Sequence, residues 1–182
     1  KGRAMIHANK LIIIAGACVL AGCAGEAAVT PTPAPIALTA EAAGHYCQMI
    51  ILDHEGPKAQ MFLAGMENPL WFSQVRDGLA YVKSPEQSAE IVVMYVNDMG
   101  KAKNWSEPGD DNWIRADEAF YVVGSDALGG MGAPELVPFA EEDAALAFAN
   151  LRGGEVRHLE DITQDHVLAP VDHDETNKEV SK

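Results

Sequence analysis

Residues 58–96, KAQMFLAGMENPLWFSQVRDGLAYVKSPEQSAEIVVMYV, decide the fold class, because strand and helix signals alternate within them. Residues 58–64 alternate between two faces, which is typical of a β-strand. Asn68 and Pro69 then predict a helix start, with asparagine as the N-cap and proline at the first helical position. The β-branched, apolar residues 90–96 predict a central strand after that helix.

The segment in front of this stretch adds one more element. Residues 46–53 form an apolar run that predicts a strand, and the HEGP sequence at residues 54–57 predicts the turn after it. The expected order is therefore strand, strand, helix, strand, in a first unit at residues 44–100.

Residues 101–168 repeat this order in a second unit. The expected elements are a strand at 113–124, a glycine-rich loop at 129–132, a strand at 135–139, a helix from 141 that ends at Gly153-Gly154, and a strand at 155–159. A unit of about 55 residues is too small to stand alone, so the two would share a core. We therefore predict an α+β fold of two small strand-strand-helix-strand units packed together.

The N-terminal residues 1–22 have the features of a lipoprotein signal peptide. A basic start without an acidic residue precedes an apolar run at residues 11–20, which is too short to span a bilayer. Leu20-Ala21-Gly22-Cys23 then resembles a bacterial lipobox, in which Cys23 would carry the lipid. This predicts export and a lipid anchor in a membrane. The alternative is a buried helix that ends at Gly22.

Two further segments lie outside the predicted units. Residues 23–43, rich in Ala, Pro and Thr, predict the lipid anchor and an extended tether, and the polar residues 169–182 predict a disordered tail. The formal net charge is −14, so phosphates would be repelled and a nucleic-acid partner is excluded.

Cys47 is the cysteine left free once Cys18 leaves with the signal peptide and Cys23 is lipidated. On the predicted strand, Cys47 and Met49 would point to the same face, where a thiolate and a thioether favour Cu(I) over hard cations. Met131, flanked by glycines in GGMG, could bring a third sulfur close. The alternative for Cys47 alone is a buried, inert thiol.

The other candidate ligands carry weaker signals. His45 would share the face of Cys47, as a ligand, as a group behind a ligand, or as a surface residue. His54 is expected to be a solvated turn residue, and Met61 and Met94 are expected in the core. No nucleophile elbow, phosphate loop, dinucleotide fingerprint or zinc-site spacing is present in the sequence, so we expect no enzyme activity.

Five blocks resemble the NosL family, lipoproteins that accompany nitrous oxide reductase. In order, these blocks are CQMIILDHEGPKAQ, WFSQVRDGLAYVKSPE, VNDMG, WIRADEAFYVVGS and GGMGAPELVPF, and they span about residues 44–160. The resemblance implies two strand-strand-helix-strand units related to the organomercury lyase fold. It also implies a membrane-tethered, periplasm-facing Cu(I) chaperone that delivers copper toward the reductase, with a NosD-type protein of an ABC transporter system as a partner.

Carried over residue by residue, Cys47 and Met49 match the family's Cys-x-Met motif and Met131 matches its Gly-Gly-Met-Gly methionine, whereas His45 matches less securely. Two other classes stay open. An enzyme that cleaves carbon–metal bonds would need a pair of thiols, and a lipoprotein without a metal could act as a scaffold for reductase assembly. A second metal such as zinc, held by His45 or a carboxylate, also stays open.

Overall fold

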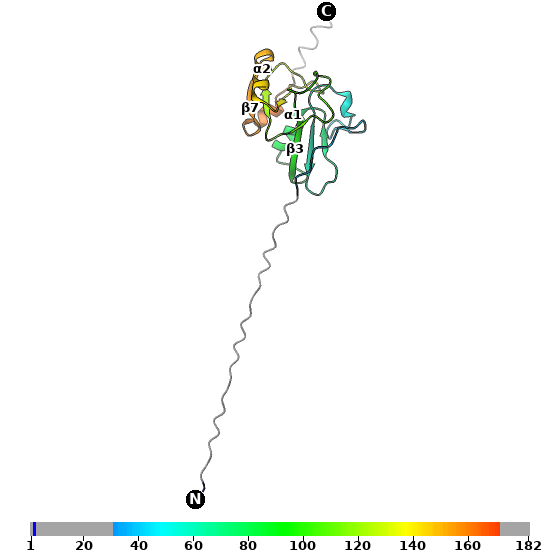
Figure 1. The fold of residues 1–182 in the computed structure, drawn as a ribbon, viewed down its shortest axis with the longest axis vertical. Helices are drawn as coiled ribbons and strands as arrows, with labels where there is room; N and C mark the ends of the chain where they lie inside the picture. The colour runs from blue at the N-terminus through cyan, green and yellow to red at the C-terminus, as the bar shows by residue number, and fades with distance from the viewer. Residues whose placement is uncertain (1, 3–30, 172–182) are drawn as a thin grey trace, which may run out of the picture. The chain divides into compact units, whose positions relative to one another are not determined.

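The computed structural model describes residue 2 and residues 31–171, and two antiparallel sheets with helices beside them make up this part (Figure 1). Its helices and strands lie in one compact body that begins at Thr32. The predicted α+β class is confirmed. Among the described residues, no helix is long and apolar enough to cross a membrane.

The first sheet is built from the stretch that decides the fold class. Its elements are β1 (Ala59–Leu63), β2 (Leu70–Phe72), α1 (Val75–Lys83) and β3 (Ile91–Asn97), and β1 pairs antiparallel with both β2 and β3. Successive side chains of β1 point to opposite faces of the sheet, and both faces are buried. Met61 and its same-face neighbours enter the core that α1 covers, whereas Phe62 joins a separate cluster with Val93 and Tyr95.

The second sheet has the same topology. It contains β5 (Phe120–Val123), β6 (Val137–Phe139), α2 (Glu142–Arg152) and β7 (Glu155–His158), in the spatial order β6-β5-β7. In each unit the first strand therefore lies in the middle of three. Figure 1 shows α2 beside β7, and Phe148 of this helix packs against Phe139 of β6 at a ring distance of 5.3 Å.

The two units share one core. Tyr121 and Leu136, from the second half of the chain, belong to the same buried cluster as Phe72 and Leu79 from the first. The chain closes with two short helical turns, η2 (Leu159–Asp161) and α3 (Gln164–Leu168), and Val167 of α3 enters this cluster too. β4 (Trp113–Arg115) lies beyond the unit boundary expected at residue 100, yet it pairs with β3 and extends the first sheet.

Three local predictions were wrong. Residues 46–53 form no strand but a turn followed by η1 (Ile51–Asp53). The helix expected at Asn68 begins at Val75, because residues 70–72 pair with β1 as a strand. The long strand expected at 113–124 divides into β4 and β5, separated by a turn in which the Glu118 N–H donates to the Arg115 carbonyl.

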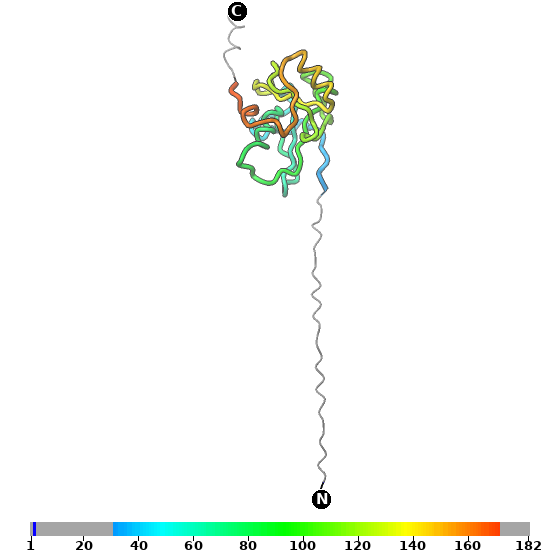
Figure 2. The backbone as a smooth tube through the Cα atoms, turned by 90° about the vertical axis from the view of Figure 1, so that its left-hand side faces the viewer, coloured from blue at the N-terminus to red at the C-terminus, as the bar shows by residue number. Residues whose placement is uncertain are grey.

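The segment expected to be a tether packs on the folded body from Pro33 onward. Tyr95 Oη donates to the Pro33 carbonyl, Ile36 exchanges two hydrogen bonds with the Gln60 side chain, and Leu38 is buried with Ile51. Figure 2 shows this segment, in blue, entering the body. The predicted signal peptide, lipidated Cys23 and residues 172–182 of the predicted tail lie outside the described residues, Gly2 excepted.

Candidate metal centre

Cys47 lies in a tight turn. The Gly44 N–H donates to the Met49 carbonyl and the Gln48 N–H donates to the Gly44 carbonyl, both at 2.9 Å. Gln48 adopts a left-handed φ of 57°, so Cys47 and Met49 cannot follow the strand geometry that the sequence suggested. The turn nevertheless keeps both sulfur-bearing residues within one short loop.

The Cys47 thiol is a partly exposed free thiol in a confined place. Its Sγ lies 3.7 Å from Ser73 Oγ, and this weak hydrogen bond is the contact that anchors it to the first sheet's end. A Cβ added to Gly44 would lie only 2.5 Å from Sγ, so the glycine makes room for the sulfur. A partly exposed thiol with one weak hydrogen bond is accessible to a soft metal ion.

The glycine-rich loop that carries Met131 rests against the same short segment. A Cβ on Gly130 would lie 3.0 Å from the Ser73 carbonyl oxygen, and the Met131 N–H donates to Gln74 Oε1 at 3.2 Å. Cys47 and Met131, which are far apart in the sequence, thus both contact the dipeptide Ser73-Gln74. Met131 and Met49 are 45 % and 48 % exposed, so neither thioether is used as core filling.

His45 is placed among aromatic rings. Its imidazole lies 5.0 Å from the Tyr46 ring, 5.8 Å from Phe72 and 5.7 Å from Tyr81, measured between centroids. Its backbone N–H donates to the Trp71 carbonyl, which ties the Cys47 turn to β2. His45 therefore packs against aromatic rings, and its role as a weaker metal ligand stays a prediction.

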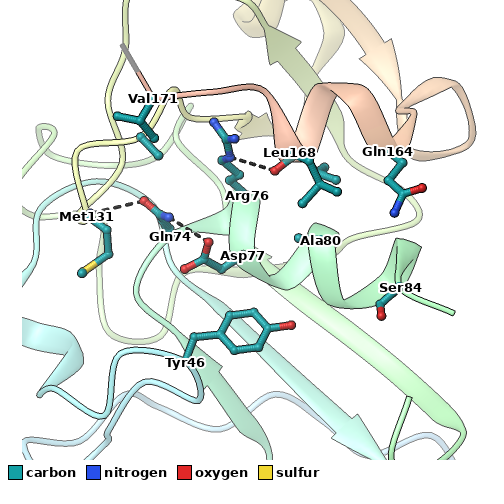
Figure 3. Close-up of a pocket in the computed structure, with 12 residues that line it drawn as sticks. Tyr46, Gln74, Arg76, Asp77, Ala80, Ser84, Met131, Gln164, Leu168 and Val171 are labelled. Atoms are coloured by element: carbon teal, nitrogen blue, oxygen red, sulfur yellow. Dashed lines mark hydrogen bonds between the residues drawn. The ribbon is translucent and has the colours of Figure 1, made fainter. Parts of the chain in front are cut away.

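A pocket of about 540 Å³ opens beside the loop of Met131 (Figure 3). Tyr46 and Met131 line it together with Asp77, and Leu168 of α3 closes another side. Burial raises the pKa of Asp77, against the opposing effects of its hydrogen bond to Gln74 and the charge of Arg76. Burial, followed by the nearby Asp77 charge, raises the pKa of the Tyr46 hydroxyl.

Several polar residues that support the site were missed from the sequence. Glu135 is only 1 % exposed, and its carboxylate accepts hydrogen bonds from the backbone N–H groups of Val75, Arg76 and Leu136. Burial raises the pKa of Glu135 to about 8, although these three donors act in the opposite direction. The sequence contained one indication that Glu135 is buried: it stands between a glycine-rich loop and the apolar run of β6.

Lys58 is a second buried charge that the sequence analysis did not single out. Its Nζ donates to the carbonyls of Glu55 and Gly56, and burial lowers its pKa to about 8 against the opposing charge of Glu135. Its place at the edge of an alternating strand gave no hint of burial.

Met61 and Met94 lie where the sequence predicted them, whereas His54 does not. Met61 and Met94 are buried as expected. His54, expected to be a solvated turn residue, instead pairs through Nδ1 with the Gly130 carbonyl at 2.9 Å, and its Nε2 is buried without a hydrogen-bond partner. Because a carbonyl only accepts, Nδ1 carries the proton of this bond. His54 thereby holds the loop of Met131 at Gly130, one residue before the contact with Gln74.

Within residues 31–171, no three His, Cys, Asp or Glu side chains cluster closely enough to hold a metal ion. The ligands expected from the sequence, Cys47, Met49 and Met131, bear sulfur instead, and Cys47 and Met131 both contact Ser73-Gln74. One thiolate with neutral thioethers suits a soft monovalent ion such as Cu(I) and is a poor match for hard cations.

Comparison with known proteins gives one consistent family. The family model of NosL matches residues 35–167. The copper-binding lipoprotein NosL of Achromobacter cycloclastes is 53 % identical over 163 residues, covering 89 % of this chain and 83 % of the relative. The protein of the same name from Stutzerimonas stutzeri is 36 % identical over 160 residues, covering 87 % and 82 %.

A solved structure agrees with these matches. The crystal structure of the copper chaperone NosL from Shewanella denitrificans superposes with a TM-score of 0.68 at 30 % identity, covering 74 % of this chain and 98 % of that one. Sequence and fold point to the same relatives, and the chain belongs to the NosL family.

Proposed function

We propose that this protein is a Cu(I) chaperone, held at a membrane by a lipid on Cys23 and facing the periplasm, that delivers copper for the copper centres of nitrous oxide reductase. The observation that carries the proposal is the convergence of Cys47 and Met131 on Ser73-Gln74 in a member of the NosL family. The names of its relatives, a copper-binding lipoprotein and a copper chaperone, agree with it.

In this proposal Cys47 binds copper as a thiolate, and Met49 and Met131 complete a site of low coordination number. Thioethers are neutral, weak ligands, so they hold Cu(I) without trapping it. The half-exposed methionines and the partly exposed cysteine leave the ion within reach of an incoming ligand. Copper could then pass to a partner by ligand exchange, one sulfur leaving as another arrives.

The partners belong to the same proposal. A NosD-type periplasmic protein of an ABC transporter system and the reductase itself would receive or exchange the copper. The strongly acidic chain, with a formal net charge of −14, would be steered toward a basic patch on such a partner. A second metal such as zinc would require His45 or a carboxylate beside the copper.

The decisive experiment is a Cu(I) titration of residues 24–182 against a competing chelator. This part retains the helices and strands that the structure describes and lacks Cys18 and Cys23. We expect one tight equivalent in the parent, lost in Cys47→Ser and weakened in Met131→Leu. Met66→Leu is the matched control, because Met66 is 46 % exposed and lies outside the proposed site.

The rival from another class is a scaffold lipoprotein that binds no metal. It predicts that the Cys47→Ser protein still supports full copper loading of the reductase in cells. A titration without any tight equivalent, together with normal reductase maturation in the Cys47→Ser strain, would replace the chaperone by the scaffold.

A further inference from the structure

The N-terminus of α1 is capped from another part of the chain. Gln74, the N-cap residue, has an extended backbone and its side chain makes no capping hydrogen bond. The carboxylate of Glu135 instead accepts the N–H groups of Val75 at 3.2 Å and Arg76 at 2.9 Å. These are among the donors that a helix leaves without an internal partner, so Glu135 fixes where α1 begins.

This capping leaves the Gln74 side chain available for the loop. Its Oε1 accepts the Met131 N–H, and its Nε2 donates to Asp77 Oδ1 at 2.8 Å in the first turn of α1 (Figure 3). The amide of Gln74 is buried and joins the helix to the backbone of Met131. The two bonds also fix which end of the amide faces which partner, since only the oxygen can accept.

Packing reinforces the hydrogen bonds. A Cβ on Gly129 would lie 2.6 Å from Gln74 Oε1 and equally 2.6 Å from Glu135 Oε2. The loop backbone therefore lies directly on both side chains. Any residue other than glycine at position 129 would have to displace them. Moving either side chain would move the residues that precede Met131.

Resting on the proposed function, we propose that Gln74 and Glu135 are positioning residues for copper: Gln74 holds the backbone of Met131, and Glu135 holds Gln74 by fixing the start of α1. Met131 is 45 % exposed, so packing does little to orient its side chain. A weak thioether ligand contributes more to affinity when it is held near the metal in advance, and groups behind a ligand supply that order.

A double-mutant cycle separates positioning from general stability. Cu(I) affinity of residues 24–182 is measured by chelator competition for Gln74→Ala and Glu135→Ala, each in the parent and in Met131→Leu. We expect each of these two changes to weaken binding roughly tenfold in the parent. In the Met131→Leu background, where the positioned ligand is absent, we expect less than about a twofold effect.

Gln60→Ala is the matched control. Gln60 is also a fully buried glutamine whose side chain makes two hydrogen bonds to a backbone, that of Ile36, but it lies away from the loop. This variant should lower the unfolding midpoint and leave Cu(I) affinity unchanged. Gln74→Leu, which preserves bulk, serves if the alanine variant does not fold.

The outcomes are distinguishable. Equal losses of affinity in the parent and in Met131→Leu would overturn the positioning role, as would a folded Gln74→Ala protein with unchanged affinity. If Met131→Leu alone leaves affinity unchanged while Cys47→Ser abolishes it, the assignment of Met131 as a ligand fails instead. If no variant or parent binds Cu(I), the proposed function itself fails.

Discussion

Cys47 Sγ lies 3.7 Å from Ser73 Oγ, and Ser73 is followed by the glutamine that holds the backbone of Met131. The Cys47 thiol and the Met131 backbone thus contact one dipeptide at the end of β2. Neither contact depends on the strand face that would have joined Cys47 to Met49. The site we propose would therefore bring together the turn of Cys47 and the loop of Met131 at Ser73-Gln74.

Gly44→Ala tests whether the Cys47 sulfur needs its present position. The new Cβ would lie 2.5 Å from Sγ, so the sulfur must move away from its place beside Ser73. We expect Cu(I) affinity to fall several-fold in a chelator competition. Gly78→Ala is the control, because its Cβ would meet Met94 Cε at the same 2.5 Å, inside the core, and should leave copper binding intact. Equal effects of the two changes would contradict the prediction.

Gly130→Ala tests the seat of the Met131 loop. Its Cβ would lie 2.6 Å from His54 Cβ and 3.0 Å from the carbonyl oxygens of Glu55 and Ser73, so backbone must shift. We expect weaker Cu(I) binding and a lower unfolding temperature, measured by circular dichroism. Gly132→Asn is the control, since its surroundings are open and asparagine tolerates its φ of 76°. A Gly130→Ala protein with parental affinity would show that the loop does not position a ligand.

Glu135 predicts a pH dependence of stability. Its pKa is raised from 4.5 to about 8 by burial, so between these values the folded state binds more protons than the unfolded state. The free energy of unfolding should therefore fall as pH rises through this window, by on the order of 4 kcal/mol, with a slope that reaches about 1.4 kcal/mol per pH unit in its middle.

Urea denaturation between pH 5 and pH 8 measures this slope. Glu135→Gln should flatten it, whereas Glu86→Gln, at an exposed position, should not. Lys58 acts in a different window, because its pKa is lowered from 10.5 to about 8 and its contribution makes stability rise with pH above 8. A slope that persists in Glu135→Gln would assign the effect to another group.

Leu38→Ala tests the docking of the segment expected to be a tether. Leu38 is buried in a cluster with Ala42 and Ile51, against Trp71 and Trp113. Removing its side chain should destabilise the fold by about 2–5 kcal/mol, the usual cost of a Leu→Ala change in a core. Thermal and urea denaturation measure the loss. Ile36→Ala is the control, since that side chain is exposed, and a larger effect there would contradict the docking.

The local pattern of apolar and polar residues predicted those helices and strands whose form is not changed by pairing with distant segments. The alternating run became β1, the β-branched run became β3, and α2 begins and ends within one residue of the acidic start and the glycine pair. These segments follow their own periodicity because their apolar faces meet a core on the expected side. The order of the second unit could be predicted for the same reason, whereas in the first unit the strand expected at residues 46–53 does not form and residues 70–72 supply the second strand instead.

Where a distant partner competes, local pattern failed. Trp71 and Phe72 have helical spacing with the residues that follow, but their backbone pairs with β1, so the helix begins only at Val75. The run around Cys47 meets β2 at a single bridge between Gly44 and Trp71, and it closes into a turn through Gly44 and does not continue as a strand. Hydrogen bonds to other segments outweigh a propensity of a few tenths of a kcal/mol per residue.

The sequence by itself determined the α+β class and the element order of the second unit, and it named three sulfur residues as candidate ligands, because periodicity and residue chemistry are local properties. The tertiary structure alone decided that Cys47 and Met131 meet at Ser73-Gln74 and that Glu135 caps α1. It also decided that His54 and Gln74 hold the Met131 loop at two successive residues. Each of these contacts joins residues far apart in the chain, and its geometry exists only once the two sheets share a core.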